Sequence, residues 1–261
     1  MGTLESGFEG RNSNEKKEGY DVGVTVYLMR HARKATYKGE LSPEGEADAK
    51  ELGGKLDRLT KMYKTAPLEA AHSGHKRPHR TAELLLDPEE TELPEGDERF
   101  SGEVREGLKD MCSPALDAEY ERLLKGEVEN ESAALQMLID TGTTRYDAES
   151  PSSVEISQKV ARELLRIVDE TKGYPSGTKK PITLVSHSSV VENFLVDLLD
   201  IRKEEKSVLR MGGGLKFLED MRLYINRKSP EEVELRYRFR EFEGSLTEER
   251  LRELAGKAIE A

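Results

Sequence analysis

The sequence predicts an α/β fold: a three-layer, doubly wound, mainly parallel sheet with helices on both faces. Two apolar runs, 24–29 and 182–185, are rich in β-branched residues, and each has the length of a buried strand and is too short for a helix. Amphipathic helical patterns lie between and after these runs. Buried strands that alternate with helices form parallel sheets through right-handed crossovers.

The first strand, 24–29, ends abruptly in Arg30 and His31. Open α/β sheets bind ligands at the carboxyl ends of their strands, so both residues are candidate site residues. The first crossover helix follows, with Ser42 as its N-cap and Pro43 at its first position.

A short strand at 68–71 leads into a histidine-rich loop and a second helix. Arg77 lies near the start of this helix, where free backbone amides favour an anion. His75 and His79 are one helical turn apart and, with His72, could suggest a metal site. Since no carboxylate or thiol completes such a site, we expect surface histidines and no bound metal.

The stretch 108–146 has a weak helical periodicity that is broken by Ser113-Pro114, Gly126 and Gly142. We interpret it as a helical insertion over the active site. The predicted organisation is therefore a disordered tail at 1–21 and one domain at 22–261 that contains this insertion.

Ser152 and Glu155 form a capping box that opens the next helix. The second strand, 182–185, then ends in Ser186 and His187, as the first ends in Arg30-His31. If the two strands are neighbours in one parallel sheet, their histidines meet at its carboxyl edge.

Toward the C-terminus a helix is expected at 190–199, a turn at Gly212-Gly213-Gly214 and a final helix capped by 245–248. In 235–240 apolar residues alternate with arginines, which is typical of a strand solvated on one face. Such an arginine stripe could touch nucleic acid, but the net charge of −11 favours the solvated face.

Composition indicates a globular protein, because 36% of the 261 residues are charged yet several apolar runs occur. The net charge of −11 argues against a general nucleic-acid binder. No run approaches the roughly 20 apolar residues of a membrane span. The single cysteine, Cys112, excludes an intrachain disulfide and fits a reducing compartment, and the first 20 residues lack a secretory signal. We expect a cytoplasmic protein without membrane or nucleic-acid partners.

The candidate residues fit phosphoryl chemistry. A neutral imidazole can attack phosphorus, and arginine forks match phosphoryl oxygens. We expect Arg30, Arg77 and a protonated His187 to surround a phosphate that His31 attacks. An acid must also protonate the leaving alcohol.

Together these segments resemble the histidine phosphatase superfamily, the phosphoglycerate-mutase-like enzymes. The matching segments are Arg30-His31, Leu41-Ser42-Pro43-Glu44-Gly45, Ser73 with Arg77, Thr81 and Ala82, Val104-Arg105-Glu106, and Ser186-His187. They stand in the family's order and span about 160 of the 261 residues.

The resemblance implies a phosphohistidine on His31, phosphate binding by Arg30, Arg77 and His187, and proton donation by Glu106. Glu103 is three residues from Glu106, and the sequence leaves the choice between them open. A proton donor at Glu106 is expected to be partly buried beneath the insertion.

Two positions depart from the family pattern. Ala32 stands where the family usually has glycine after the nucleophile. Tyr37 stands where phosphoglycerate mutases carry asparagine, and the loop to Leu41 is short. The second departure favours a phosphatase over a mutase.

The predicted function is a phosphoric monoester hydrolase of the histidine acid phosphatase type, without cofactor or metal. Its substrate is expected to be a phosphorylated small molecule or a phosphoprotein, selected by the insertion, where Arg145 and Lys109 could meet a second anionic group. One alternative is a mutase-like phosphotransferase or a phosphohistidine protein phosphatase. Another is an inactive, phosphate-binding interaction module, for which Ala32 is the favouring feature. The sequence does not determine the oligomeric state.

Overall fold

The computed structural model describes residues 21–35, 39–90, 100–109, 116, 118, 122 and 131–256. The predicted tail, apart from Asp21, lies outside these ranges, as do Tyr37, Cys112 and most of the first half of the predicted insertion.

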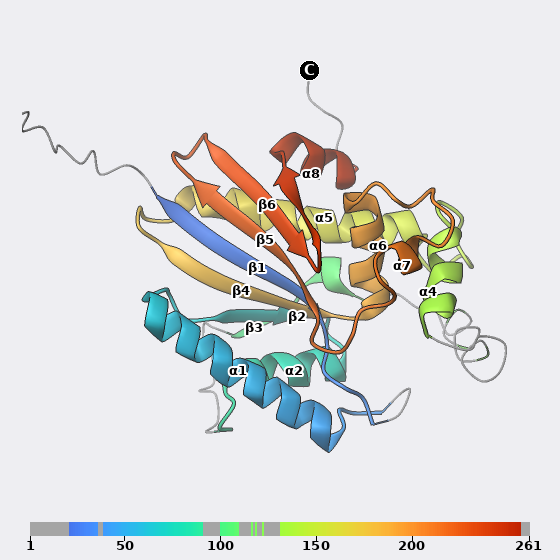
Figure 1. The fold of residues 1–261 in the computed structure, drawn as a ribbon, viewed down its shortest axis with the longest axis horizontal. Coiled ribbons are helices and arrows are strands. Elements are labelled where there is room, and N and C mark those ends of the chain that lie inside the picture. Colours follow the sequence, from blue (N-terminus) through green and yellow to red (C-terminus); the bar gives the residue numbers. More distant parts are fainter. Residues whose placement is uncertain are drawn as a thin grey trace, which may run out of the picture.

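Within the described residues, seven strands form one sheet (Figure 1). They are β1 (Val22–Arg30), β2 (Glu69–His72), β3 (Phe100–Val104), β4 (Lys179–Ser186), β5 (Asp220–Arg227), β6 (Val233–Phe239) and β7 (Phe242–Leu246). Their order across the sheet is β3-β2-β4-β1-β5-β6-β7.

The sheet is mixed, and the prediction of a mainly parallel sheet is wrong for its C-terminal half. The pairs β1–β4, β4–β2 and β2–β3 are parallel, whereas β1–β5, β5–β6 and β6–β7 are antiparallel. Only residues 228–232 join β5 to β6, and residues 240–241 join β6 to β7. Connections this short form hairpins, while a parallel pair needs a crossover of a dozen or more residues.

The parallel half places the ends of β1 and β4 side by side, as predicted. Arg30 is opposite Ser186 in the register, so His31 and His187 both follow at the same edge of the sheet. On one face of β1, Val22, Val24 and Val26 are at most 1% exposed. This strand therefore lies in the core. Its burial fixes the position of its carboxyl end, after which His31 follows.

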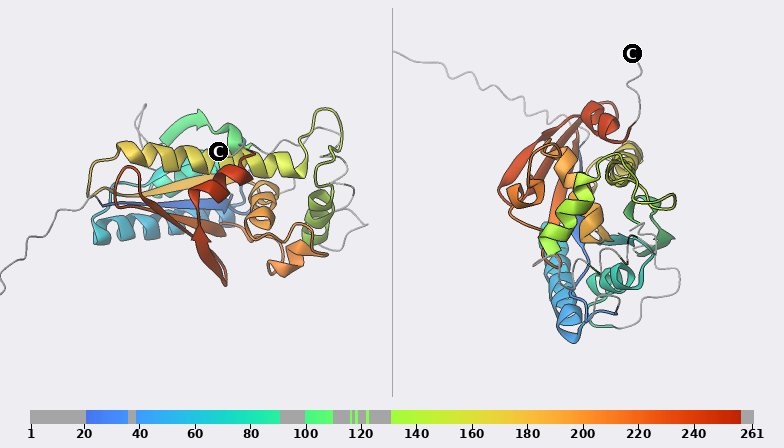
Figure 2. Two further views of the ribbon diagram at one scale, coloured as in Figure 1. Left: turned by 90° about the horizontal axis from the view of Figure 1, so that it is seen from above. Right: turned by 90° about the vertical axis from the view of Figure 1, so that its right-hand side faces the viewer.

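Helices lie on both sides of the sheet. They are α1 (Pro43–Tyr63), α2 (Lys76–Leu86), α4 (Glu131–Asp140), α5 (Ser153–Glu170), α6 (Ser188–Leu198), α7 (Ser207–Arg210) and α8 (Glu248–Leu254), with 3₁₀ turns η1 (Glu106–Leu108) and η3 (Thr171–Gly173). In Figure 2, α5 and α1 flank β1 and β4 from opposite sides. Of the helices in the described ranges, none is both long enough and apolar enough to cross a membrane.

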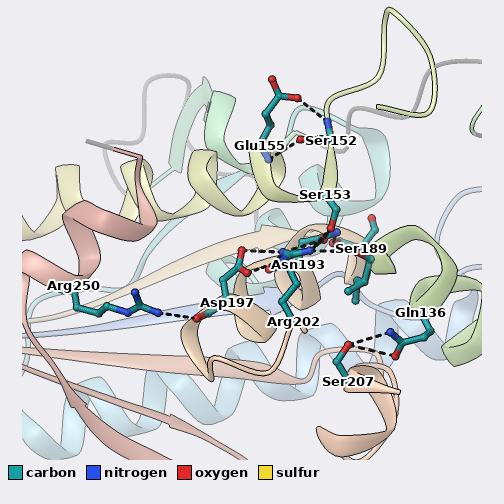
Figure 3. Close-up of polar contacts among 11 residues, drawn as sticks. Gln136, Ser152, Ser153, Glu155, Ser189, Asn193, Asp197, Arg202, Ser207 and Arg250 are labelled. Atoms are coloured by element: carbon teal, nitrogen blue, oxygen red, sulfur yellow. Dashed lines mark hydrogen bonds and ion pairs between the residues drawn. The ribbon is translucent and has the colours of Figure 1, made fainter. Parts of the chain in front are cut away.

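The predicted helix starts are confirmed. The Ser42 hydroxyl accepts from the Gly45 N–H at 3.0 Å, with Pro43 at the first helical position. At the start of α5, the Glu155 N–H donates to the Ser152 hydroxyl at 3.2 Å, and the Ser152 N–H donates to the Glu155 carboxylate at 2.7 Å (Figure 3). These bonds satisfy backbone donors that a helix start leaves unpaired.

Within the predicted insertion, the structure describes α4 as a helix that joins the main core. Leu135 and Ile139 are each 1% exposed. The Gln136 side chain donates to the Ser207 hydroxyl at 3.1 Å (Figure 3). It also accepts from the Val208 N–H at 2.7 Å, so it attaches α4 to α7. That the insertion covers the active site stays a prediction.

The alternating segment forms β6 as expected. Leu235 and Phe239 are buried at 2% and 1% exposure, while Arg236 and Arg238 are exposed. The period-two prediction of one solvated face is therefore confirmed.

Candidate active site

His31 and His187 meet at the carboxyl edge of the sheet. The His31 N–H donates to the Ser186 carbonyl at 2.8 Å, which fixes the chain where it leaves β1. The two ring centroids are 5.1 Å apart with an interplanar angle of 74°. The side chains are nearly enclosed, at 2% and 6% exposure. The structure thus brings the two predicted histidines together.

The His31 ring is oriented by its own chain. Its Nδ1 lies 2.6 Å from the Ala32 carbonyl oxygen. A carbonyl only accepts, so Nδ1 carries the proton and Nε2 keeps its lone pair. Burial, followed by the nearby His187 and Arg77, lowers the pKa of His31 to about 2. The ring is therefore neutral near pH 7, as a nucleophile must be.

His187 is also neutral near pH 7 in this structure, and its protonation around a bound phosphate stays a prediction. Burial comes first among the causes that hold its pKa well below the ordinary value, followed by the charges of Arg77, His75, Arg30 and Lys34. These cations repel a further positive charge. A phosphate dianion placed among them would reverse the balance and favour protonation.

Arg30 and Arg77 supply the positive charge that was predicted around the two histidines. Arg30 is 3% exposed, and its Nη1 donates to the Leu215 carbonyl at 2.5 Å. Its guanidinium carbon lies 4.1 Å from the centre of the Phe217 ring, which in turn lies 6.0 Å from His31. Arg77, in the first turn of α2, acts electrostatically on both histidines.

The other histidines pack beside this centre. The ring of His75, predicted as a surface residue, is exposed on its loop but lies 5.1 Å from His187 at 88°. His72 was also predicted at the surface, and this is wrong, because it is buried at 4% exposure. Its ring lies 4.5 Å from that of His79 at an interplanar angle of 39°, and burial followed by the charge of His79 lowers the pKa of His72 to about 4. Among the described residues, no three His, Cys, Asp or Glu side chains are arranged to hold a metal ion.

The fold is similar to that of a solved phosphatase. A mycobacterial glucosyl-3-phosphoglycerate phosphatase superposes with a TM-score of 0.50 and 16% identity, over 83% of this chain and 98% of that one. This chain shares the fold of that phosphatase. A phosphoserine phosphatase from Entamoeba histolytica, solved as a mutant in complex with phosphoserine, gives a TM-score of 0.49 at 16% identity over 77% and 90% of the two chains. No family model and no curated protein sequence matches this chain.

Within this fold, Glu106 does not have the environment expected of the proton donor. Its side chain is 77% exposed, and its carboxylate lies 2.5 Å from the Lys109 ammonium. The 3₁₀ turn η1 buries Leu108 instead, whose carbonyl accepts from the Ser186 hydroxyl at 2.6 Å. The predicted partial burial of Glu106 is therefore wrong. The Glu103 side chain lies outside the described atoms, so the choice between the two carboxylates stays open.

The two residues predicted to meet a second anionic group are each engaged in an ion pair. Lys109 pairs with Glu106. Arg145 donates through Nε to the Glu155 carboxylate at 3.0 Å, and this bond is the first cause that lowers the Glu155 pKa to about 2. Arg145 therefore supports the capping box at the start of α5.

Ala32 is buried in an apolar cluster next to His31. Its side chain is 0% exposed and belongs to an apolar cluster with Leu41, Ala49 and Leu84. Its N–H donates to the Thr81 hydroxyl at 3.1 Å. The methyl group thus fills core space in this cluster, and packing accounts for alanine at this position.

Gly45, by contrast, shows why part of the matching motif cannot vary. A Cβ atom at this position would lie 2.1 Å from the Arg33 carbonyl oxygen. The close approach seats the start of α1 against the chain that follows His31.

Sequence reasoning missed the segment 211–219, which provides Leu215 and Phe217 to Arg30. The only signal was the run of three glycines, which predicted a turn and gave no indication of its partner. The contact joins residues 185 positions apart, beyond the reach of any local pattern.

Proposed function

We propose that this protein is a phosphomonoesterase that hydrolyses phosphate esters through a phosphohistidine on His31. The observation that carries the proposal is the buried, neutral His31 ring, whose Nδ1 is bonded to the Ala32 carbonyl at 2.6 Å and whose Nε2 is left as the nucleophile. His187 lies 5.1 Å away, and Arg30 and Arg77 add positive charge.

In the first step, Nε2 of His31 attacks phosphorus while the bond from phosphorus to the ester oxygen breaks. The alcohol leaves with a proton from a general acid. Arg30, Arg77 and His187 stabilise the charge on the transferred group, which is the main requirement of phosphoryl transfer. The ring proton stays on Nδ1, so the Ala32 carbonyl stabilises the phosphorylated imidazole.

In the second step, water attacks the phosphohistidine, the bond from nitrogen to phosphorus breaks, and phosphate is released. The His31 lone pair is thereby restored. The general acid of the first step accepts a proton from the water in the second.

Glu106 is the proposed general acid and base. Its exposed side chain must turn from Lys109 toward the substrate. Surface ion pairs contribute about 0–1 kcal/mol, so this rotation has a low cost. Glu103 is the alternative.

Hydrolysis is favoured over the mutase and protein phosphatase alternatives. A solved structure that shares this fold at a TM-score of 0.50 is named as a glucosyl-3-phosphoglycerate phosphatase. We therefore propose a phosphorylated small molecule as the substrate class, with no cofactor. The inactive-module alternative loses its support because the Ala32 methyl is buried in the core.

The test is hydrolysis of para-nitrophenyl phosphate by the wild type, His31→Ala and Arg77→Met, with and without EDTA. We expect turnover by the wild type in EDTA, none by His31→Ala and a raised KM for Arg77→Met. A wild type that binds inorganic phosphate but never turns over would favour the inactive module, and full activity of folded His31→Ala would refute the mechanism.

A further inference from the structure

The segment 211–219 connects α7 to β5 and approaches the active site from the antiparallel half of the sheet. It contains three consecutive glycines, and Gly212 and Gly213 have left-handed φ values of +85° and +91°. Glycine restricts the backbone least of all residues. This segment therefore needs contacts from elsewhere to hold one conformation.

Arg30 depends on that conformation. Its guanidinium donates to the Leu215 carbonyl at 2.5 Å and stacks on the Phe217 ring at 4.1 Å. Its backbone N–H donates to the Glu219 carbonyl at 3.1 Å. The carbonyl and the ring together set the plane of the guanidinium, and this plane decides which way its N–H fork points.

Arg240, which is not part of the segment 211–219, holds it in place through its side chain. It lies in the turn between β6 and β7, and its guanidinium donates to the carbonyl of Met211, to that of Gly213 at 3.0 Å and to that of Gly214 at 3.1 Å. It also forms a two-pronged pair with the Glu219 carboxylate, at 2.6 and 2.7 Å. One side chain thus ties both ends of the segment together.

Two further residues hold its middle. The Leu215 N–H donates to Glu192, a carboxylate with 0% exposure on α6. The Gly214 N–H donates to the Ser132 hydroxyl on α4 at 2.9 Å. The N–H of Leu215 is therefore fixed by the core, while its carbonyl orients Arg30.

We propose that Arg240 is a positioning residue that acts through the segment 211–219 to orient Arg30 for a phosphoryl group. This inference rests on the proposed function of the site. A guanidinium that is already oriented stabilises a phosphoryl group without reorganising when the group arrives. Without the Arg240 contacts, the glycine-rich segment gains freedom, and Arg30 loses its fixed plane.

The test compares Arg240→Met with Arg202→Met. Arg202 is a matched control because its side chain is 14% exposed, against 15% for Arg240, and it likewise pairs with a carboxylate, that of Asp197, and with a backbone carbonyl, that of Asn193 at 2.8 Å (Figure 3). Inorganic phosphate binding is measured by calorimetry, and KM and kcat are measured with para-nitrophenyl phosphate.

We expect Arg240→Met to weaken phosphate binding by roughly 10- to 100-fold, the range for losing one charged hydrogen bond or misplacing a group by about 1 Å. Both variants should lower the melting temperature, but Arg202→Met should bind phosphate as the wild type does. If Arg240→Met does not fold, Arg240→Lys tests the inference instead. Lysine keeps the positive charge that pairs with Glu219 but lacks the guanidinium N–H groups that bond to three carbonyls. Phosphate binding by Arg240→Lys should be weakened.

A double-mutant cycle separates positioning from a general effect. If Arg240 acts through Arg30, adding Arg240→Met to Arg30→Met leaves phosphate binding unchanged from Arg30→Met alone. If the losses in phosphate affinity from Arg240→Met and Arg30→Met are additive, or if a folded Arg240 variant binds phosphate like the wild type, the inference about Arg240 is overturned. The proposed function of the site would be unaffected. A wild type that neither binds phosphate nor hydrolyses the ester would overturn the proposed function, and the inference with it.

Discussion

The Nδ1 atom of His31 lies 2.6 Å from the carbonyl oxygen of Ala32, the next residue in the chain. The bond assigns the ring proton to Nδ1 and leaves the lone pair on Nε2. Because Ala32 is itself held by Thr81 and by its buried methyl, the orientation of the nucleophile is set by the core. The same arrangement governs how the protein should respond to acid, to trapping and to mutation.

The buried neutral His31 should make folding sensitive to acid. Its pKa is about 2 in the folded protein and near 6.5 in the unfolded chain. Between these values the unfolded state binds the extra proton, so stability falls as the pH falls through 6.5 and below. Urea unfolding at pH 7 and pH 5 should show this loss in the wild type and a smaller one in His31→Gln. Equal losses in the two proteins would contradict the assignment.

The covalent intermediate should be trappable. Reaction with a phosphorylated substrate followed by a rapid quench should leave one phosphate on His31 that is stable to base and lost in acid, which is the behaviour of a phosphoramidate. His187→Ala is the useful comparison, because it keeps the nucleophile. Mass spectrometry that places the label on His187, or on neither ring, would reject the proposed roles.

The parallel half of the fold and the two histidines could be predicted because they follow from local patterns. A buried run that ends in Arg30-His31 and another that ends in Ser186-His187 specify two strand ends, and parallel neighbours bring these ends together. The antiparallel half could also have been predicted, because only five residues lie between β5 and β6, too few for the crossover that a parallel pair needs.

The rest depends on tertiary contacts that no local pattern encodes. The exposure of Glu106 is set by the direction in which η1 turns, and a sequence motif fixes only its place in the chain. Phe217 reaches Arg30 across the fold, and Arg240 in an alternating strand pattern resembled one more solvated arginine. These are the residues that shape the phosphoryl site around its predicted centre.

The aromatic contact on Arg30 should contribute to phosphate binding. Replacing Phe217 by leucine keeps apolar bulk but removes the stacking face, which is worth about 0.5–2 kcal/mol, or roughly 2- to 30-fold in affinity. Competition by inorganic phosphate against an aryl phosphate measures the loss. Tyr146→Leu, at an aromatic position 45% exposed, is the control and should bind phosphate unchanged. Unaltered binding by Phe217→Leu would assign the ring to packing alone.

The proton donor can be identified by measuring the activity of Glu106→Gln and Glu103→Gln on alkyl and on aryl phosphates. Glu106→Gln should slow alkyl phosphate hydrolysis by roughly two to four orders of magnitude, the range for a positioned general acid. Aryl phosphates, with better leaving groups, should be affected less. Lys109→Met is the control for loss of the ion pair and should retain activity. If Glu103→Gln is the impaired variant, the acid has been assigned to the wrong residue, and if neither is, phosphohistidine becomes the favoured substrate.

Ala32 offers a test of whether the departure from the family glycine limits activity. Its methyl is fully buried beside Leu41, Ala49 and Leu84, so Ala32→Gly removes core contacts and adds backbone freedom. The two effects together should cost about 1–2 kcal/mol of unfolding free energy. Because the methyl packs in this apolar cluster, kcat and KM should stay near those of the wild type. Urea unfolding and aryl phosphate kinetics measure the two quantities side by side. A large gain in activity for Ala32→Gly would show instead that the methyl obstructs the phosphoryl site, and would restore the case for a weakened or inactive family member.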